Sequence, residues 1–327
     1  MAESMIWYGE SGSTKTSQLA NFAKWLYEKT GKRTRLITGD GGGFKPIEDA
    51  GLIEFGIVEV MDLTATGMPL ATLRRLSKGQ WYYNVKDASG KINRQMCNTP
   101  EKHWEKIGAY AVEGLGSISD VILNHIANQP EKVMYENVRW EEDGETFGSN
   151  NEGHYGLVQK EMYATVMAMK SLPLEYTIWT SLVGRGEDKK TKETVYGPQV
   201  AGNKKTPVAP QWFGSCLHFH KFMVENKDSE TGIVTYENSP VAFFVDHPDE
   251  QTGIRYLAKP RCAPSEYPKL KGMFPGGYIS MTPEIGIEQY FNALEKLRKG
   301  GTEVTKEWKD KVDAKRIANS NNDVRVP

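Results

Sequence analysis

An apolar run, a turn of small polar residues and a stretch of helical periodicity follow one another within residues 5–31. The apolar run covers residues 5–8, and the turn after it reads GESGSTKTS. Over residues 17–30 apolar side chains recur at helical spacing, and Gly31 follows in the position of a helix C-cap. A strand that leads through such a turn into a helix predicts the opening unit of an α/β domain.

The turn has the residue types that bind a phosphate group. Its glycines and serines let backbone N–H groups face an anion, Lys15 can reach the terminal phosphates, and the Thr16 hydroxyl can hold Mg²⁺. The spacing departs from G-x-x-x-x-G-K-[ST], because the second glycine is Gly12 and Thr14 directly precedes the lysine. We therefore predict a variant phosphate loop for ATP and Mg²⁺. Its binding residues are Gly9, Glu10, Ser11, Gly12, Ser13, Thr14, Lys15, Thr16 and Ser17.

Thr14 leaves two conformations of this loop open. If the backbone needs a positive φ there, the β-branched side chain is strained. If Thr14 instead belongs to the first helical turn, the only cost is reduced room beside the phosphate. The alternative for the whole stretch is a small-residue turn that precedes a lysine by coincidence.

Later segments continue the α/β pattern. Strand-like and helical stretches alternate, which predicts a mainly parallel sheet flanked by helices. The further strand-like stretches are residues 33–40, 51–63, 106–115 and 175–183. Short β-type segments after residue 214 predict antiparallel hairpins at the C-terminal edge, and residues 81–92 predict a hairpin that turns at Ser89-Gly90. The polar segment 131–153 predicts a long loop.

Two regions follow from this pattern. Residues 1–265 contain all of the predicted sheet and form the main domain. Residues 266–327 comprise a C-terminal helix and a polar tail that is expected to be partly disordered.

Carboxylates and hydroxyls follow the predicted strands. Glu113 ends the run AYAVE, where P-loop enzymes place an acid for the Mg²⁺ shell or the attacking water; a solvated glutamate is the alternative. Asp40 ends the second strand and is either a general base or an ordinary Asp-Gly turn. Thr180 and Ser181 end a later strand and are candidate sensors of the γ-phosphate, although strand hydroxyls are common without function.

Three further cations are candidates for contact with phosphate. Arg185 lies in a charged, glycine-bearing segment that predicts an exposed loop. Lys259 and Arg261 alternate along a strand-like segment, so their side chains share one face. At a subunit edge this pair could reach a neighbour's γ-phosphate as a trans-acting finger. Charge protection of an edge strand is the alternative.

Five segments, in order, resemble a known family. They read IWYGESGSTKTSQLANFA, TRLITGDGGGF, AYAVEGLGSISDVI, YTIWTSLVGRGEDKKTKETVYGPQVAGNKKTP and YLAKPR. Over about residues 4–265 the chain is similar to phage-encoded RecA-like P-loop ATPases, which include small RecA-core proteins of the single-strand annealing group. The resemblance implies a RecA-like core, Mg²⁺-ATP, a homo-oligomeric ring or filament with ATP between subunits, and a role near single-stranded DNA.

The resemblance also assigns roles by position. Lys15 and Thr16 match the phosphate and Mg²⁺ residues, and Glu113 takes the Walker B position. Lys259 and Arg261 match the K-x-R trans finger, which favours that role over edge protection. The chain departs from the family in the residue before the lysine, usually glycine, and in a glutamate where aspartate is usual. These departures bear on the hydrolysis rate more than on nucleotide binding.

Composition limits the remaining classes. Lys and Arg total 41 against 42 Asp and Glu, which argues against a uniformly basic surface and is compatible with a local basic stripe. The three cysteines are scattered, which favours a reducing compartment and hence the cytoplasm. No apolar run approaches the roughly 18 residues that a membrane span needs, so no membrane partner is expected.

The sequence as a whole predicts an oligomeric ATPase that acts on DNA, in phage recombination, single-strand annealing or replication. One alternative is a nucleotide-gated assembly protein with little turnover, which Thr14 favours. Another is a DNA-packaging or virion-assembly motor, which duplex DNA would stimulate.

Overall fold

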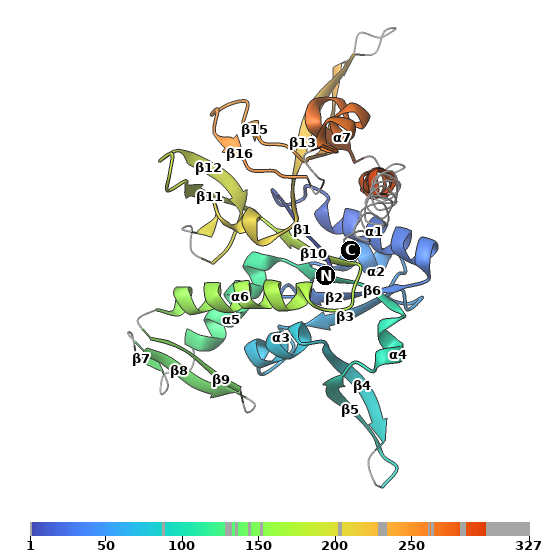
Figure 1. Cartoon of the computed structure of the whole chain (residues 1–327), viewed down its shortest axis with the longest axis vertical. Coiled ribbons are helices and arrows are strands. Elements are labelled where there is room, and N and C mark those ends of the chain that lie inside the picture. The colour runs from blue at the N-terminus through green and yellow to red at the C-terminus, as the bar shows by residue number, and fades with distance from the viewer. Residues whose placement is uncertain are drawn as a thin grey trace, which may run out of the picture.

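A large mixed sheet with helices on both faces forms the centre of the molecule (Figure 1). This computed structural model describes residues 2–298 apart from short gaps. The gaps are residues 87–88, 128–132, 135–136, 143–144, 151–152, 202–204, 228–233, 261, 263–264 and 282–285.

The central sheet has the strand order β17-β14-β13-β1-β10-β6-β2-β3. Its strands are β1 (Glu3–Gly9), β2 (Arg33–Thr38), β3 (Val58–Asp62), β6 (Ile107–Glu113), β10 (Tyr176–Ser181), β13 (Ser215–Lys227), β14 (Val234–Phe243) and β17 (Tyr278–Ser280). Every pair from β13 to β3 is parallel, whereas β13 with β14 and β14 with β17 are antiparallel. The predicted mainly parallel sheet with an antiparallel C-terminal edge is therefore confirmed.

Side chains alternate between two hydrophobic cores along β1. Ile6 and Tyr8 belong to one core, and Met5 and Trp7 belong to the other. All four are fully buried, because helices cover both faces of a parallel sheet. Burial of a large apolar side chain contributes about 1.5–3 kcal/mol, so the alternation fixes which residues face each layer.

The two faces are covered by different helices. Helix α1 (Lys15–Thr30) and helical residues 288–298 pack in the core that contains Trp7. The opposite core is covered by α3 (Pro69–Ser77), α5 (Leu115–Ala127) and α6 (His154–Lys170). Within the described part of the chain, none of the helices combines the length and apolar character that crossing a bilayer requires.

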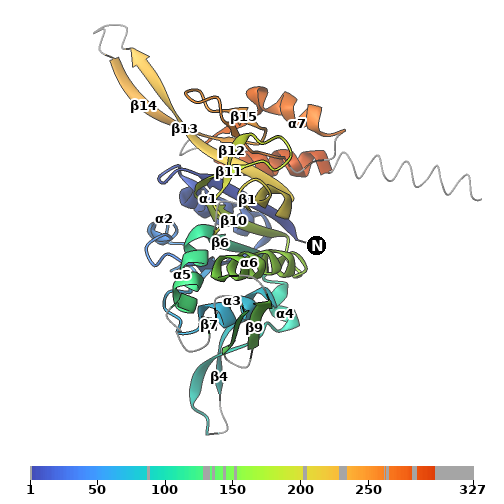
Figure 2. The same cartoon turned by 90° about the vertical axis from the view of Figure 1, so that its left-hand side faces the viewer.

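A two-stranded hairpin, a ribbon of the central sheet and a four-stranded sheet extend from this body. The hairpin of β4 (Gln80–Lys86) and β5 (Ile92–Asn98) projects from one end, and the β13–β14 ribbon projects from the other (Figures 1 and 2). A four-stranded sheet has the order β11-β12-β16-β15. Its strands are β11 (Val183–Glu187), β12 (Thr194–Pro198), β16 (Arg255–Tyr256) and β15 (His247–Pro248).

Three expectations about local structure are wrong. Much of segment 131–153 forms strands, β7 (Val133–Met134), β8 (Asn137–Glu142) and β9 (Glu145–Asn150), rather than a loop. Val138 and Trp140 do alternate with polar residues, but the high polarity of the rest of the segment obscured this short strand signal. The third strand is only β3, because Gly51 and Gly56 adopt positive φ angles of 70° and 67° and form turns before it. Arg185 lies on β11, not in a loop.

Candidate nucleotide site

A cavity of about 400 Å³ opens where the parallel strands β6 and β10 end and where the loops after β1 and β2 begin. Seven consecutive residues, Ser11 to Ser17, line it together with Asp40, Glu113 and the pair Thr180-Ser181. Four segments that are far apart in sequence therefore meet at one edge of the sheet. Most of the residues expected to contact a nucleotide lie in this one cavity.

Lys15 is the first residue of α1 and is buried, with 8% of its surface exposed. Its Nζ donates to the carbonyl oxygens of Gly9 (2.8 Å) and Glu10 (2.9 Å) and to Ser13 Oγ (3.1 Å). Burial lowers the pKa of Lys15 to about 8, although Glu113 and Glu10 oppose the shift. The three acceptors are uncharged, so the ammonium retains much of its attraction for an anion.

Gly9 has a steric reason to be glycine. A Cβ there would lie 2.2 Å from the Phe219 carbonyl oxygen and 2.7 Å from Ser13 Oγ. Because β1 and β13 pair in parallel with Gly9 opposite Phe219, the two backbones are fixed at this distance. Any larger residue would push the loop away from the sheet.

Thr14 adopts the strained conformation with a positive φ, and not that of the first helical turn. It is the N-cap of α1, with φ 70° and ψ 5°, and its Oγ1 is buried with no hydrogen-bond partner among the described atoms. Gly12, two residues earlier, also has a positive φ of 73°. A β-branched residue in this region costs on the order of 1–3 kcal/mol. The sequence has glycine at the first such position and threonine at the second.

Glu113 connects the phosphate loop to the neighbouring strand. Its Oε1 accepts a hydrogen bond from Thr16 Oγ1 (2.8 Å) and its Oε2 accepts one from Thr180 Oγ1 (2.6 Å). The Gly114 N–H donates to Thr180 Oγ1 (2.9 Å), which fixes that hydroxyl in turn. Burial raises the pKa of Glu113, and the two hydroxyls and Lys15 partly offset the effect.

The oxygen atoms at this point suit Mg²⁺. The Thr16 hydroxyl and the Glu113 carboxylate are hard ligands already in contact, and Mg²⁺ with a nucleotide needs only one or two protein ligands. Among the described residues no group of three His, Cys, Asp or Glu side chains converges on one point. A Mg²⁺ ion held by these two residues would take its remaining ligands from phosphate oxygens and water.

Asp40 and Ser181 line the cavity in different environments. Asp40 is exposed, and its Oδ1 accepts a hydrogen bond from the Gly42 N–H (3.1 Å). Ser181 is buried, and its Oγ donates to the Gln199 carbonyl oxygen (2.8 Å). Asp40 is thus accessible to a water molecule, whereas Ser181 holds the segment that follows β12.

The remaining predicted cations lie elsewhere. Arg185 is exposed on β11 and does not line the cavity. Lys259 forms a backbone bridge with Cys216, and its Nζ donates to the Phe213 carbonyl oxygen (3.3 Å). Lys259 lines a different cavity, of about 580 Å³, beside Glu3 at the amino end of β1. Arg261 lies outside the described residues.

Two residues beside the loop are not indicated by the sequence pattern. If Gly12 carried a Cβ, it would lie 3.8 Å from Lys221 Nζ, so this ammonium is next to the phosphate loop. His218 is stacked on the ring of Tyr8, and its Nδ1 lies 3.0 Å from His247 Nε2. Burial lowers the pKa of His218 to about 2, so this ring is neutral. Parallel pairing of β13 with β1 brings both residues here across more than 200 positions.

A comparison with models of known protein families, and a second with characterised proteins, find no match to this chain. The sheet topology shows an α/β fold with a large, mostly parallel mixed sheet, and any more specific assignment depends on the geometry of the site.

Proposed function

We propose that this protein is a RecA-like P-loop ATPase that binds ATP with Mg²⁺ and acts on DNA as an oligomer. The observation that carries the proposal is the convergence of Lys15, Thr16 and Glu113 in one cavity that the glycine- and serine-rich loop borders. A buried cation, a hydroxyl–carboxylate pair and a turn of small residues are the parts that phosphoryl transfer requires.

In this proposal the loop amides and Lys15 hold the phosphates. Thr16 and Glu113 would hold Mg²⁺, which when bound offsets phosphate charge. Glu113 or Asp40 would orient the attacking water. The raised pKa of Glu113 suits a base, since catalysis is best when the pKa of the base is near the working pH. Thr180 fixes one oxygen of that carboxylate and so sets its direction.

The oligomer follows from the family resemblance and is compatible with the position of Lys259. A residue that completes a neighbour's site must lie away from its own nucleotide cavity. Lys259 is exposed at the amino end of the sheet, whereas the phosphate loop is at the carboxyl end. With Arg261 it would reach the γ-phosphate of the next subunit.

One observation favours an ATP-gated assembly protein as a second candidate. Thr16 and Thr180 donate hydrogen bonds to the two oxygens of Glu113, at 2.8 Å and 2.6 Å, and these bonds favour the charged carboxylate and so weaken it as a base. Together with the strained Thr14, this favours slow turnover with ATP as a switch.

Phosphate release under steady-state conditions separates these candidates. The ATPase proposal expects release by the native chain, stimulation by single-stranded DNA, and loss of about 100-fold or more in Lys15→Ala. Lys24→Ala, on the exposed face of the same helix, is the matched control and should behave as the native chain. Tight ATP binding with no release above Lys15→Ala would contradict turnover and support the switch. Stimulation by duplex DNA alone would support a packaging motor.

A further inference from the structure

A second large cavity lies at the amino ends of the parallel strands, whereas the phosphate loop lies at their carboxyl ends. It has a volume of about 640 Å³ and is bordered by the amino ends of β2, β3 and β6 and by the base of the β4–β5 hairpin. Four of its described lining residues are Lys or Arg (Arg33, Arg35, Arg94 and Lys106), against a single carboxylate, Glu59. Trp81, Tyr82 and Tyr83 add aromatic rings to the same wall. We call this cavity the hairpin groove.

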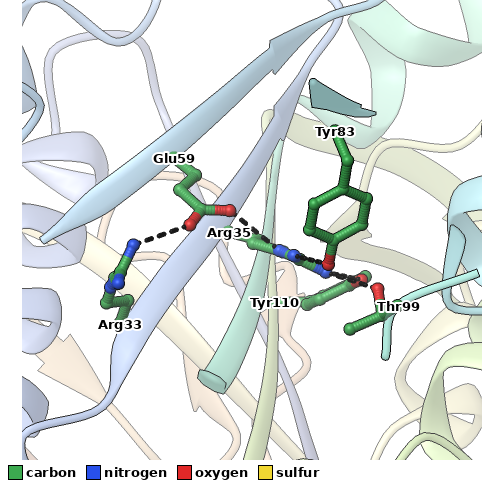
Figure 3. Close-up of polar contacts among 6 residues, drawn as sticks. All are labelled: Arg33, Arg35, Glu59, Tyr83, Thr99 and Tyr110. Atoms are coloured by element: carbon green, nitrogen blue, oxygen red, sulfur yellow. Dashed lines mark hydrogen bonds and ion pairs between the residues drawn. The ribbon is translucent and has the colours of Figure 1, made fainter. Parts of the chain in front are cut away.

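Arg35 lines the hairpin groove and is only 2% exposed. Figure 3 shows the polar residues around it. Its guanidinium donates to Glu59 Oε2 (3.0 Å), Tyr83 OH (2.7 Å), Tyr110 OH (3.1 Å) and Thr99 Oγ1 (2.9 Å). Burial opposes its charge, but the contacts with Tyr110, Tyr83 and Glu59 together raise its pKa. All three guanidinium nitrogens are therefore engaged within the protein, and Arg35 is a structural residue.

Both oxygens of Glu59, the single carboxylate among the described residues that line the groove, accept from arginines. Arg33 Nη1 donates to Glu59 Oε1 at 3.1 Å while Arg35 holds Oε2 (Figure 3). Within the described residues neither Arg94 nor Lys106 makes an ion pair, and both are exposed. Two positive charges at the rim of the hairpin groove are thus available to an anion.

The hairpin extends this surface away from the body. The guanidinium of Arg94 lies 5.2 Å from the ring centre of the half-buried Tyr82, on the neighbouring strand of the hairpin. Residues 80–98 contain three Lys or Arg and one acid. The hairpin projects beyond the rest of the chain in both views (Figures 1 and 2). A cationic arm with a half-buried aromatic ring therefore leads into the groove.

We propose that the hairpin groove and its arm bind single-stranded nucleic acid. Phosphates would contact Arg94 and Lys106, and an unpaired base would stack on Tyr82. An acidic peptide would satisfy the cations but leave the ring without a partner, and a duplex would hide its base faces. The proposal rests on the proposed function, in which DNA is the partner, and it places DNA and ATP at opposite edges of one sheet.

The test is fluorescence anisotropy of a labelled oligo-dT strand with the full chain in Mg²⁺ and a slowly hydrolysed ATP analogue. Arg94→Glu and Lys106→Glu should each weaken binding by about tenfold and flatten its salt dependence. Tyr82→Ala should weaken binding by a similar factor, whereas Tyr82→Phe keeps the ring and the affinity. Lys269→Glu makes the same charge change on α7 (Tyr267–Met273), at the far end of the molecule, and should leave binding unchanged (Figure 1).

Equal affinity across all the variants would overturn the proposal, because the strand would then bind elsewhere. A preference for a matched duplex, or no binding of the strand by the native chain, would overturn it as well. Phosphate release without DNA, measured in the same samples, is expected to stay at the native level in every variant. That measurement shows separately whether the ATPase proposal holds.

Discussion

The phosphate-loop cavity and the hairpin groove each contain a buried cation near a carboxylate. The two cations differ in their hydrogen-bond partners and in the direction of their pKa shifts. Lys15 donates to uncharged acceptors, and its pKa is lowered to about 8. Arg35 donates to Glu59 and to three hydroxyls, and its pKa is raised. A buried charge whose contacts are neutral is poised for a ligand. A buried charge whose contacts are complete supports the fold.

The largest effect on stability is expected from Arg35→Met. The substitution leaves the buried hydroxyls of Tyr110 and Thr99 without their donor, at about 1–3 kcal/mol each, and leaves Glu59 with Arg33 alone. Urea unfolding measures this loss, and Glu59→Gln should cost less because the amide oxygen can still accept from Arg35, so that only the partly exposed Arg33 loses its acceptor. If Arg35→Met lowered the free energy of unfolding by less than Lys15→Met does, Arg35 would not be the more important of the two cations for the fold.

Lys15→Met should have the largest effect on activity and little effect on stability. It removes the cation expected to contact the phosphates, and phosphate release should fall by about 100-fold or more. The free energy of unfolding should change by less than about 1 kcal/mol, since the lysine contacts are neutral and its burial disfavours the charge. Native-like turnover in this variant would remove Lys15 from the site.

Thr14→Gly should stabilise the chain by about 1 kcal/mol and keep or raise ATP turnover. Glycine adopts φ 70° without strain, and the change also removes a buried hydroxyl without a partner. Lys192→Gly is the matched control, because Lys192 is the other described non-glycine residue with a positive φ, 63°, and lies outside the site. It should gain stability with no change in turnover. A collapse of turnover in Thr14→Gly alone would show that the threonine has a specific role.

Lys15 also gives the stability of the chain a pH dependence. The pKa of Lys15 is about 8 when folded and 10.5 in its ordinary state, so between these values the unfolded chain binds more protons. Stability therefore rises with pH across this window, by a total on the order of 1–3 kcal/mol. The difference between the unfolding free energies of the native chain and of Lys15→Met, measured as a function of pH, isolates this contribution. A difference that stays constant from pH 8 to 10.5 would contradict the lowered pKa.

Structural features that depend on residues close together in the sequence could be predicted. The order strand, loop, helix around Lys15 and the acid at the end of β6 follow from apolar runs and short connections, and both are confirmed. Glu113 could be placed near the loop because parallel strands end at one edge. Its exact partners, Thr16 and Thr180, could not be predicted.

Contacts between distant segments leave no local pattern. Lys221 lies near Gly12 only because β13 pairs with β1, and the hairpin groove exists only because β4–β5 folds back onto Arg35. The backbone conformation of Thr14 could not be predicted either, because threonine disfavours the positive φ that the loop imposes.

Calorimetric titration of Mg²⁺-ATP into the native chain and Lys15→Met tests the central claim most directly. We expect the native protein to bind one nucleotide per chain, in the cavity that Lys15, Thr16 and Glu113 line. Affinity should fall by about 100-fold in Lys15→Met, with unfolding unchanged within about 1 kcal/mol. Equal affinity in the two proteins, or no binding by the native chain, would contradict the claim.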